Sequence, residues 1–156
     1  MATNHINLAG EFYAMHCLFR QGYDPALTLG NTKGIDILMY NPKNNKQYKI
    51  EVKTSRTTKN EKLFGGKNLN WRMDKKHEEL MDSKLTYCFI YLSRDIKLIP
   101  RIFFVASEEV AKYVRWEHEY WLQSDHKKPV RDITMRAFRI LLNEVDKWEN
   151  NFAIFD

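Results

Sequence analysis

Three side chains on two neighbouring strand-like segments have the types and spacing needed for chemistry on a phosphate. Residues 34–40 and 47–54 flank an asparagine-rich turn, which predicts a β-hairpin. Asp36 lies near the start of the first strand, and Glu51 and Lys53 lie near the end of the second. Antiparallel pairing brings these strand ends together, so we expect the three side chains to meet at one end of the hairpin.

The spacing within the second strand favours a shared role. Glu51 and Lys53 are two residues apart and therefore point to the same face, whereas Val52 points to the other layer. Two carboxylates and an ammonium group at one sheet edge are unfavourable unless a cation and an anionic substrate use them. The pattern predicts a metal-assisted phosphodiesterase.

The composition limits the kind of protein that this chain can be. With 156 residues and 44% hydrophobic content, it predicts one soluble domain over residues 1–156. We expect no secretion signal and no membrane segment, because the amino terminus is polar and no apolar run approaches spanning length. Cys17 and Cys88 lie in apolar segments, which is typical of buried thiols in a reducing compartment. The expected location is the cytoplasm.

The positive charge is concentrated around the candidate site. The chain has a formal net charge of +5, but residues 43–76 hold eleven Lys and Arg against three acidic residues, a local excess of +8. The rest of the chain therefore carries −3. Such a run is either a solvated basic face or a surface that binds a polyanion, because Lys and Arg gain affinity by releasing phosphate counterions.

Residues 4–21 are predicted to form a helix before the hairpin. Apolar residues recur on one face at helical spacing: Leu8, Phe12, Met15 and Phe19. Glu11 falls at the border of this apolar face. It is either a rim residue that reaches water or a carboxylate that faces the Asp36 end of the sheet.

The other segments complete a predicted α/β fold. The expected elements are a short strand at 26–29, a turn at 30–34, a short helix at 73–83, strands at 85–92 and 97–105, a helix capped by Ser107, and a last helix at 134–148. The polar stretch 55–62 is expected to be mobile. We therefore predict a mixed central sheet of four or five strands flanked by helices, with the core over about 6–105 and a C-terminal helical extension over about 106–156. The apolar residues at the very end are expected to dock on the core or on a second copy.

Basic and amide residues alternate with aromatic residues after the hairpin, which suits contacts with nucleic acid. The candidate DNA-binding residues are Arg56, Lys59, Lys62, Lys67, Asn70, Arg72, Lys75 and Lys76. Phe64 and Trp71 are interpreted either as core anchors or as stacking platforms for bases. His77 is either a residue that touches the scissile phosphate or a surface or hydrogen-bonded side chain. His118 and His126 have no partner at ligand spacing, so no zinc site is predicted.

The order of these motifs resembles the PD-(D/E)xK nuclease superfamily. The likeness rests on Gly10-Glu11-Phe12 in the first helix, Gly34-Ile35-Asp36 on one strand and Glu51-Val52-Lys53 on the next, and it covers roughly residues 6–92. Small Holliday-junction-resolvase-like and restriction-like members are the most similar. Ile35 stands where the family often has proline.

The resemblance implies a restriction-endonuclease-like fold and a Mg²⁺-dependent DNA endonuclease that leaves 5′-phosphate and 3′-hydroxyl ends. Asp36, Glu51 and the Val52 carbonyl would hold one or two Mg²⁺ ions, with Mn²⁺ as an alternative. Lys53 would orient the attacking water, and Glu11 would either complete a second metal position or orient a metal-bound water.

Two other interpretations of the sequence stay open. The same fold can serve as a DNA-binding module without catalysis, or as a protein-interaction module in which Glu51 and Lys53 are an exposed pair. DNA is the expected partner of the endonuclease and of the DNA-binding module. A homodimer is a further expectation, because cleavage of both strands of a duplex needs two sites.

Overall fold

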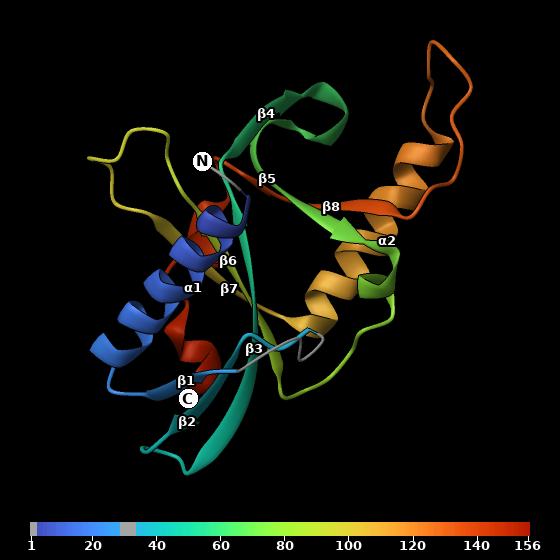
Figure 1. Ribbon diagram of the computed structural model, residues 1–156. Coiled ribbons are helices and arrows are strands. Elements are labelled where there is room, and N and C mark those ends of the chain that lie inside the picture. Colours follow the sequence, from blue (N-terminus) through green and yellow to red (C-terminus); the bar gives the residue numbers. More distant parts are fainter. Residues whose placement is uncertain (1–2, 29–33) are drawn as a thin grey trace.

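The structure is a computed structural model that describes residues 3–28 and 34–156, which form two sheets and two long helices (Figure 1). The larger sheet has the strand order β1-β2-β3-β6-β7, made of β1 (Asp24–Leu27), β2 (Ile37–Asn41), β3 (Lys46–Ser55), β6 (Leu85–Tyr91) and β7 (Arg101–Ala106). The smaller sheet has the order β4-β5-β8, made of β4 (Thr57–Glu61), β5 (Gly66–Asp74) and β8 (Met135–Leu141). In the larger sheet β3 pairs with β6 in parallel and the other pairs are antiparallel, so the predicted mixed α/β fold is confirmed.

The larger sheet is covered on both faces. Helix α1 (Thr3–Arg20) and the terminal 3-10 helix η4 (Phe152–Phe155) pack on one face, where Ile50 and Val52 of β3 enter the core. Helix α2 (Ser107–Gln123) and the smaller sheet pack on the other face, against Tyr87 and Phe89 of β6. Figure 1 shows α1 and α2 on opposite sides of the long strand β3. Alternate residues of β3 therefore face different layers, as the sequence predicted.

Helix α1 is in the predicted place, but it packs through the opposite face. Its buried residues are Gly10, Ala14 and Leu18. Of the four apolar residues predicted on one face, Leu8, Phe12 and Phe19 are 46%, 60% and 57% exposed, whereas Met15 is half-buried and packs against the core. Small residues face the sheet because the helix lies close to β3, where a Cβ at Gly10 would stand 1.9 Å from Thr54 Oγ1.

Three predicted elements are different in the structure. The stretch expected to be mobile at 55–62 contains β4, which pairs with β5. The helix expected at 134–148 is the strand β8, so the segment 106–156 combines one long helix, one strand and two 3-10 turns. The helix expected at 73–83 is only the 3-10 helix η2 (Lys75–Glu78). The turn expected at 30–34 lies, except for Gly34, outside the described residues.

The predicted cap of α2 is absent, whereas the predicted docking of the chain end is confirmed. Ser107 makes no side-chain cap on α2; its hydroxyl instead donates to the Asp82 carbonyl at 2.8 Å. The carboxyl-terminal segment docks on the core, with Phe155 fully buried. None of the helices in the described ranges has the length and apolar character to cross a bilayer.

Candidate functional site

Strand β3 extends beyond Ile37, the first residue of its antiparallel partner β2, and this offset fixes the position of the Asp36 carboxylate. The register of the two strands ends at the pair Ile37 and Ile50, and the Asp36 N–H donates to the Ile50 carbonyl at 2.9 Å. Further along β3, the Val52 N–H donates to Asp36 Oδ2 at 2.7 Å. The Asp36 carboxylate therefore lies against the middle of the Glu51-Val52-Lys53 segment, at the end of the hairpin where the sequence predicted it.

Glu51 is buried, and its two carboxylate oxygens differ in their contacts. Lys53 Nζ lies 2.5 Å from Glu51 Oε1, and His77 Nε2 lies 3.3 Å from the same atom. Glu51 Oε2 is buried and has no hydrogen-bond partner among the described residues. Burial acts to raise the pKa of Glu51, but the His77 hydrogen bond and the Lys53 ammonium hold it below its ordinary value. The side chain is therefore charged at neutral pH.

Neighbouring carboxylates add negative charge to this end of the sheet. Burial raises the pKa of Asp36, and the charge of Glu51 raises it further, against the opposing effects of the Val52 N–H and Lys53. Burial also raises the pKa of Glu11, with Asp36 as the second cause. A bound cation stabilises the charged form of carboxylates whose pKa is raised by burial and by neighbouring negative charge.

The donors present fit a hydrated magnesium ion better than a cation enclosed by protein ligands. No three His, Cys, Asp or Glu side chains in the described parts of the chain are close enough to hold a metal ion together. Mg²⁺, however, usually keeps several waters and binds protein through one or two carboxylates. The unpartnered Glu51 Oε2 and the adjacent Asp36 carboxylate meet that requirement.

A cleft of about 930 Å³ opens in front of these groups. Residues of α1 and β3 form one wall, and residues of the smaller sheet and α2 form the other. All five predicted catalytic and metal-binding residues line it: Glu11, Asp36, Glu51, Val52 and Lys53. Of the predicted DNA-binding residues, four line it: Lys59, Asn70, Arg72 and Lys76.

The other predicted DNA-binding residues lie outside this cleft. Lys62, Lys67 and Lys75 are exposed, whereas Arg56 is half-buried and its Nε has no partner among the described residues. Lys62 and Lys67 lie at the turn between β4 and β5, which Figure 1 shows curling away from the rest of the sheet. These cations can therefore contact only a ligand that extends beyond the cleft.

The aromatic residues Phe64 and Trp71 both have contacts within the protein. Trp71 is 1% exposed and its Nε1 donates to the Ile90 carbonyl at 3.0 Å, so it is a core anchor. Phe64 is half-buried, and the Arg139 guanidinium lies 4.0 Å from its ring centroid. Trp71 is therefore not available to a base, whereas Phe64 has one ring face covered by the guanidinium.

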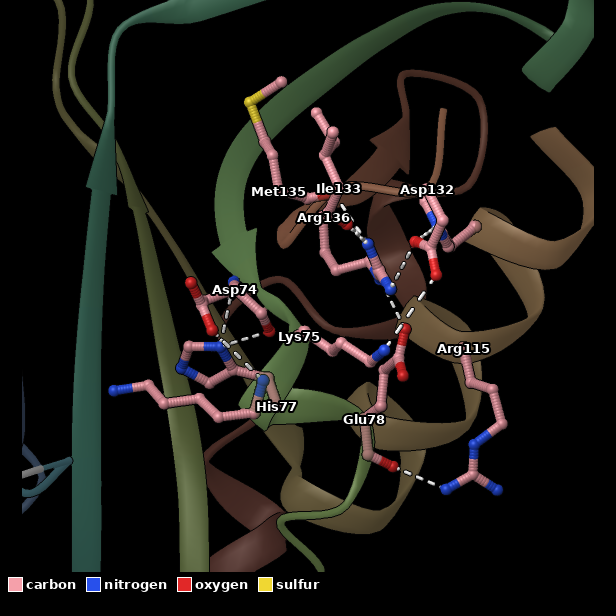
Figure 2. Close-up of polar contacts among 11 residues, drawn as sticks. Asp74, Lys75, His77, Glu78, Arg115, Asp132, Ile133, Met135 and Arg136 are labelled. Atoms are coloured by element: carbon pink, nitrogen blue, oxygen red, sulfur yellow. Dashed lines mark hydrogen bonds and ion pairs between the residues drawn. The ribbon is translucent and has the colours of Figure 1, made fainter. Parts of the chain in front are cut away.

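Two buried arginines on β8 were not anticipated from the sequence. Arg139 Nε donates to Glu61 Oε2 at 2.8 Å, and its Nη1 also contacts Glu117. Arg136 contacts Glu78, and its Nη2 donates to Asp132 at 3.4 Å; Figure 2 shows its guanidinium between these two carboxylates. Both arginines line the cleft and join the smaller sheet to its surroundings. Their partners include residues far away in sequence, so no local pattern could have revealed them.

His77 is hydrogen-bonded rather than exposed. Its side chain is buried, with Nδ1 next to the Asp74 backbone and Nε2 next to Glu51 (the Asp74 contact is visible in Figure 2). The alternative in which this residue touches a phosphate directly is not supported by its 2% exposure.

Comparison with known proteins gives a likeness in fold. No protein-family model matches the sequence, and no curated protein matches it. Among solved structures, the chain is similar to I-Ssp6803I, a bacterial homing endonuclease, with a TM-score of 0.60 and 7% sequence identity. The match covers 99% of this chain and 93% of the other. The two proteins share a fold over nearly their whole lengths.

Proposed function

We propose that this protein is a metal-dependent DNA endonuclease of the PD-(D/E)xK type, which hydrolyses phosphodiester bonds to 5′-phosphate and 3′-hydroxyl ends. One observation carries the proposal: Asp36 lies beside Glu51 of β3 in a cleft lined by cations, Lys53 Nζ is 2.5 Å from Glu51 Oε1, and Glu51 Oε2 has no partner among the described residues. The fold shared with a homing endonuclease supports it.

Each residue of the site would have a separate role in hydrolysis. Asp36, Glu51 Oε2 and the Val52 carbonyl would hold Mg²⁺, or Mn²⁺ in its place, and Glu11 would bind a water of its hydration shell. The bound ion would supply Lewis acidity and neutralise charge on the phosphate. Lys53 would orient the attacking water and stabilise the negative charge that grows on the phosphate oxygens. Water adds to phosphorus, the P–O3′ bond breaks, and the O3′ oxygen leaves with a proton.

The cations around the cleft would bind the DNA backbone. Lys59, Arg72 and Lys76 line the cleft and are exposed, so phosphates can reach them without displacing a buried ion pair. Such contacts position a duplex without reading its sequence. A homodimer would place two sites on the two strands.

A cleavage assay tests the proposal. Supercoiled plasmid and linear duplex are incubated with wild type, Lys53→Ala, Asp36→Asn and the control Lys46→Ala, with Mg²⁺ or with EDTA. We expect Mg²⁺-dependent nicking by wild type and the control, and a loss of about 10²-fold or more in both site variants. Equal activity in all four proteins, or cleavage that persists in EDTA, would contradict it.

A DNA-binding protein without catalysis is the second candidate. It is favoured by the absence of a three-carboxylate cluster in the described residues and by the ion pair that Lys53 already makes with Glu51. Calorimetry with Mn²⁺ separates the two functions. The endonuclease predicts a binding isotherm that Asp36→Asn abolishes, and the simple DNA-binding protein predicts none.

A further inference from the structure

We infer that His77 is a positioning residue that fixes the Glu51 carboxylate so that its free oxygen, Oε2, faces the cation. This inference rests on the proposed function, because it assigns a role in holding the metal. It extends that function to a residue on the smaller sheet's side of the site, outside the Asp36, Glu51 and Lys53 pattern.

The hydrogen bonds at the two ends of the imidazole assign its tautomer. The Asp74 N–H donates to His77 Nδ1 at 3.0 Å, and a backbone N–H can only donate, so this nitrogen carries the lone pair. At the other end Nε2 faces Glu51 Oε1 at 3.3 Å, and an ionised carboxylate can only accept. Both neighbours place the ring proton on Nε2. The Asp74 carbonyl also lies 2.9 Å from Nδ1, but a proton there would face the Asp74 N–H and would turn the Nε2 lone pair towards the Glu51 carboxylate.

The position of the His77 ring is fixed by the contacts of η2, the 3-10 helix that contains it. The first turn of η2 is closed by the Asp74 carboxylate accepting from the Lys76 N–H at 3.2 Å. Glu78, at the end of η2, contacts Arg136, and the Glu78 carbonyl accepts from Arg115 at 2.7 Å (Figure 2). These contacts join η2 to β8 and α2. The imidazole therefore presents its Nε2–H from a fixed place.

The consequence for Glu51 is an asymmetric carboxylate. Lys53 and His77 both lie on Oε1, whereas Oε2 has no hydrogen-bond partner of normal geometry among the described residues. The Tyr87 hydroxyl is the nearby polar group, because burial and the adjacent Glu51 carboxylate both raise the pKa of Tyr87. A cation at Oε2 would therefore bind beside this hydroxyl. Tyr87, the register partner of Glu51 on β6, packs its ring edge-on to His77 at 5.9 Å. Without the imidazole, Lys53 alone would hold Oε1, and its flexible stem would allow the carboxylate to rotate. Loss of such an outer contact typically weakens metal binding by about 10–100-fold.

Two amide substitutions distinguish the contribution of Nε2 from that of Nδ1. His77→Gln places an amide nitrogen where Nε2 lies and can restore the donor to Glu51. His77→Asn places an amide oxygen where Nδ1 lies and can restore the acceptor for the Asp74 N–H, but it cannot reach Glu51. Both are tested in the full chain by calorimetry with Mn²⁺ and by thermal unfolding without metal. The exposed His16→Asn is the control.

We expect His77→Asn to lose about 10–100-fold in Mn²⁺ affinity while unfolding close to the wild-type temperature. His77→Gln should bind Mn²⁺ within a few-fold of wild type even if it unfolds earlier. The inference is overturned if Asn binds Mn²⁺ as wild type does, or if Gln loses as much affinity as Asn. A wild type without Asp36-dependent Mn²⁺ binding overturns the proposed function and this inference together, whereas intact wild-type binding with unaffected variants overturns the inference alone.

Nitrogen NMR of the metal-free wild type gives a readout that involves no variant. The inference predicts that the His77 ring at neutral pH shows a protonated Nε2 and an unprotonated Nδ1. A proton on Nδ1 instead would overturn it.

Discussion

Gly10 and Thr54 are in contact across the interface between α1 and β3. A Cβ at Gly10 would lie 1.9 Å from Thr54 Oγ1 and 2.9 Å from Thr54 Cβ. No real side chain tolerates the first distance, so this position accepts only glycine if the helix keeps its place. The neighbouring residue in sequence, Glu11, owes its position in the cleft to the same close approach.

Gly10→Ala should therefore push α1 away from the sheet. We expect a loss of about 1–3 kcal/mol in the free energy of unfolding, as for other overpacked cores. Thr54→Ala in the Gly10→Ala background should recover part of this loss, because it removes the nearest atom but leaves Cβ. Urea denaturation of the single and double variants measures both effects. Gly10→Ala with wild-type stability would show that the helix is not held at this distance.

Asp36→Asn should stabilise the metal-free protein at neutral pH. The amide oxygen can still accept from the Val52 N–H, while the charge next to Glu51 and Glu11 is removed. The folded-state pKa of Asp36 is raised, so its charge opposes folding above that pKa, and below the unfolded pKa, about 3.9, the group is neutral in both states. The melting temperature of the variant should exceed that of wild type at pH 7, and the difference should shrink as the pH falls toward about 4. An Asn variant that melts earlier at pH 7 would contradict the assigned electrostatics.

Arg139→Met should destabilise the protein strongly. It removes the common partner of Glu61 and Glu117, and Glu117 is 4% exposed. Breaking a buried ion pair costs about 3–5 kcal/mol, and we expect the lower end because Glu61 is partly exposed. Adding Glu61→Gln and Glu117→Gln should restore much of the stability in chemical denaturation. If the triple variant is no better than the single one, charge pairing is not the reason for the loss.

DNA binding should depend on salt through the cations of the cleft. Lys59→Ala with Arg72→Ala should lower the slope of log K against log salt concentration by about 1 for each phosphate that the variant no longer neutralises. A charge-matched control is Lys46→Ala with Lys84→Ala, at the opposite end of β3 and β6. Fluorescence anisotropy with a labelled duplex at several salt concentrations gives both slopes. Equal slopes in the two double variants would place the DNA elsewhere.

The hairpin and the meeting of its three candidate side chains were predictable because they depend on local rules. Strand alternation puts Glu51 and Lys53 on one face, and antiparallel pairing returns Asp36 to the same end. The structure adds that Asp36 is fixed by the Val52 N–H, a detail of strand offset that the sequence does not specify.

The smaller sheet was missed for two physical reasons. Strand β4 has no apolar residue, because it is an exposed edge strand, so hydrophobic periodicity could not detect it. Strand β8 carries Phe138 and Ile140 into the core but also Arg136 and Arg139, whose charges are paired with residues distant in the chain. The apolar residues after β8 continue at helical spacing by coincidence.

The buried face of α1 was predicted wrongly because hydrophobic periodicity was present but did not mark the contact face. Its large apolar residues follow a helical period, yet the closeness of the sheet selects Gly10, Ala14 and Leu18 for the interface. The contact of His77 with Glu51 could not be predicted either. The two residues are 26 positions apart, and their contact depends on how η2 packs in the folded chain.

An anomalous difference map from crystals soaked in Mn²⁺ would show directly whether Asp36 and Glu51 hold a metal ion. We predict one strong peak within coordination distance of both the Asp36 carboxylate and Glu51 Oε2, absent from crystals of Asp36→Asn treated in the same way. A map without a peak at that position, or with the ion bound away from both carboxylates, would contradict the metal-dependent mechanism.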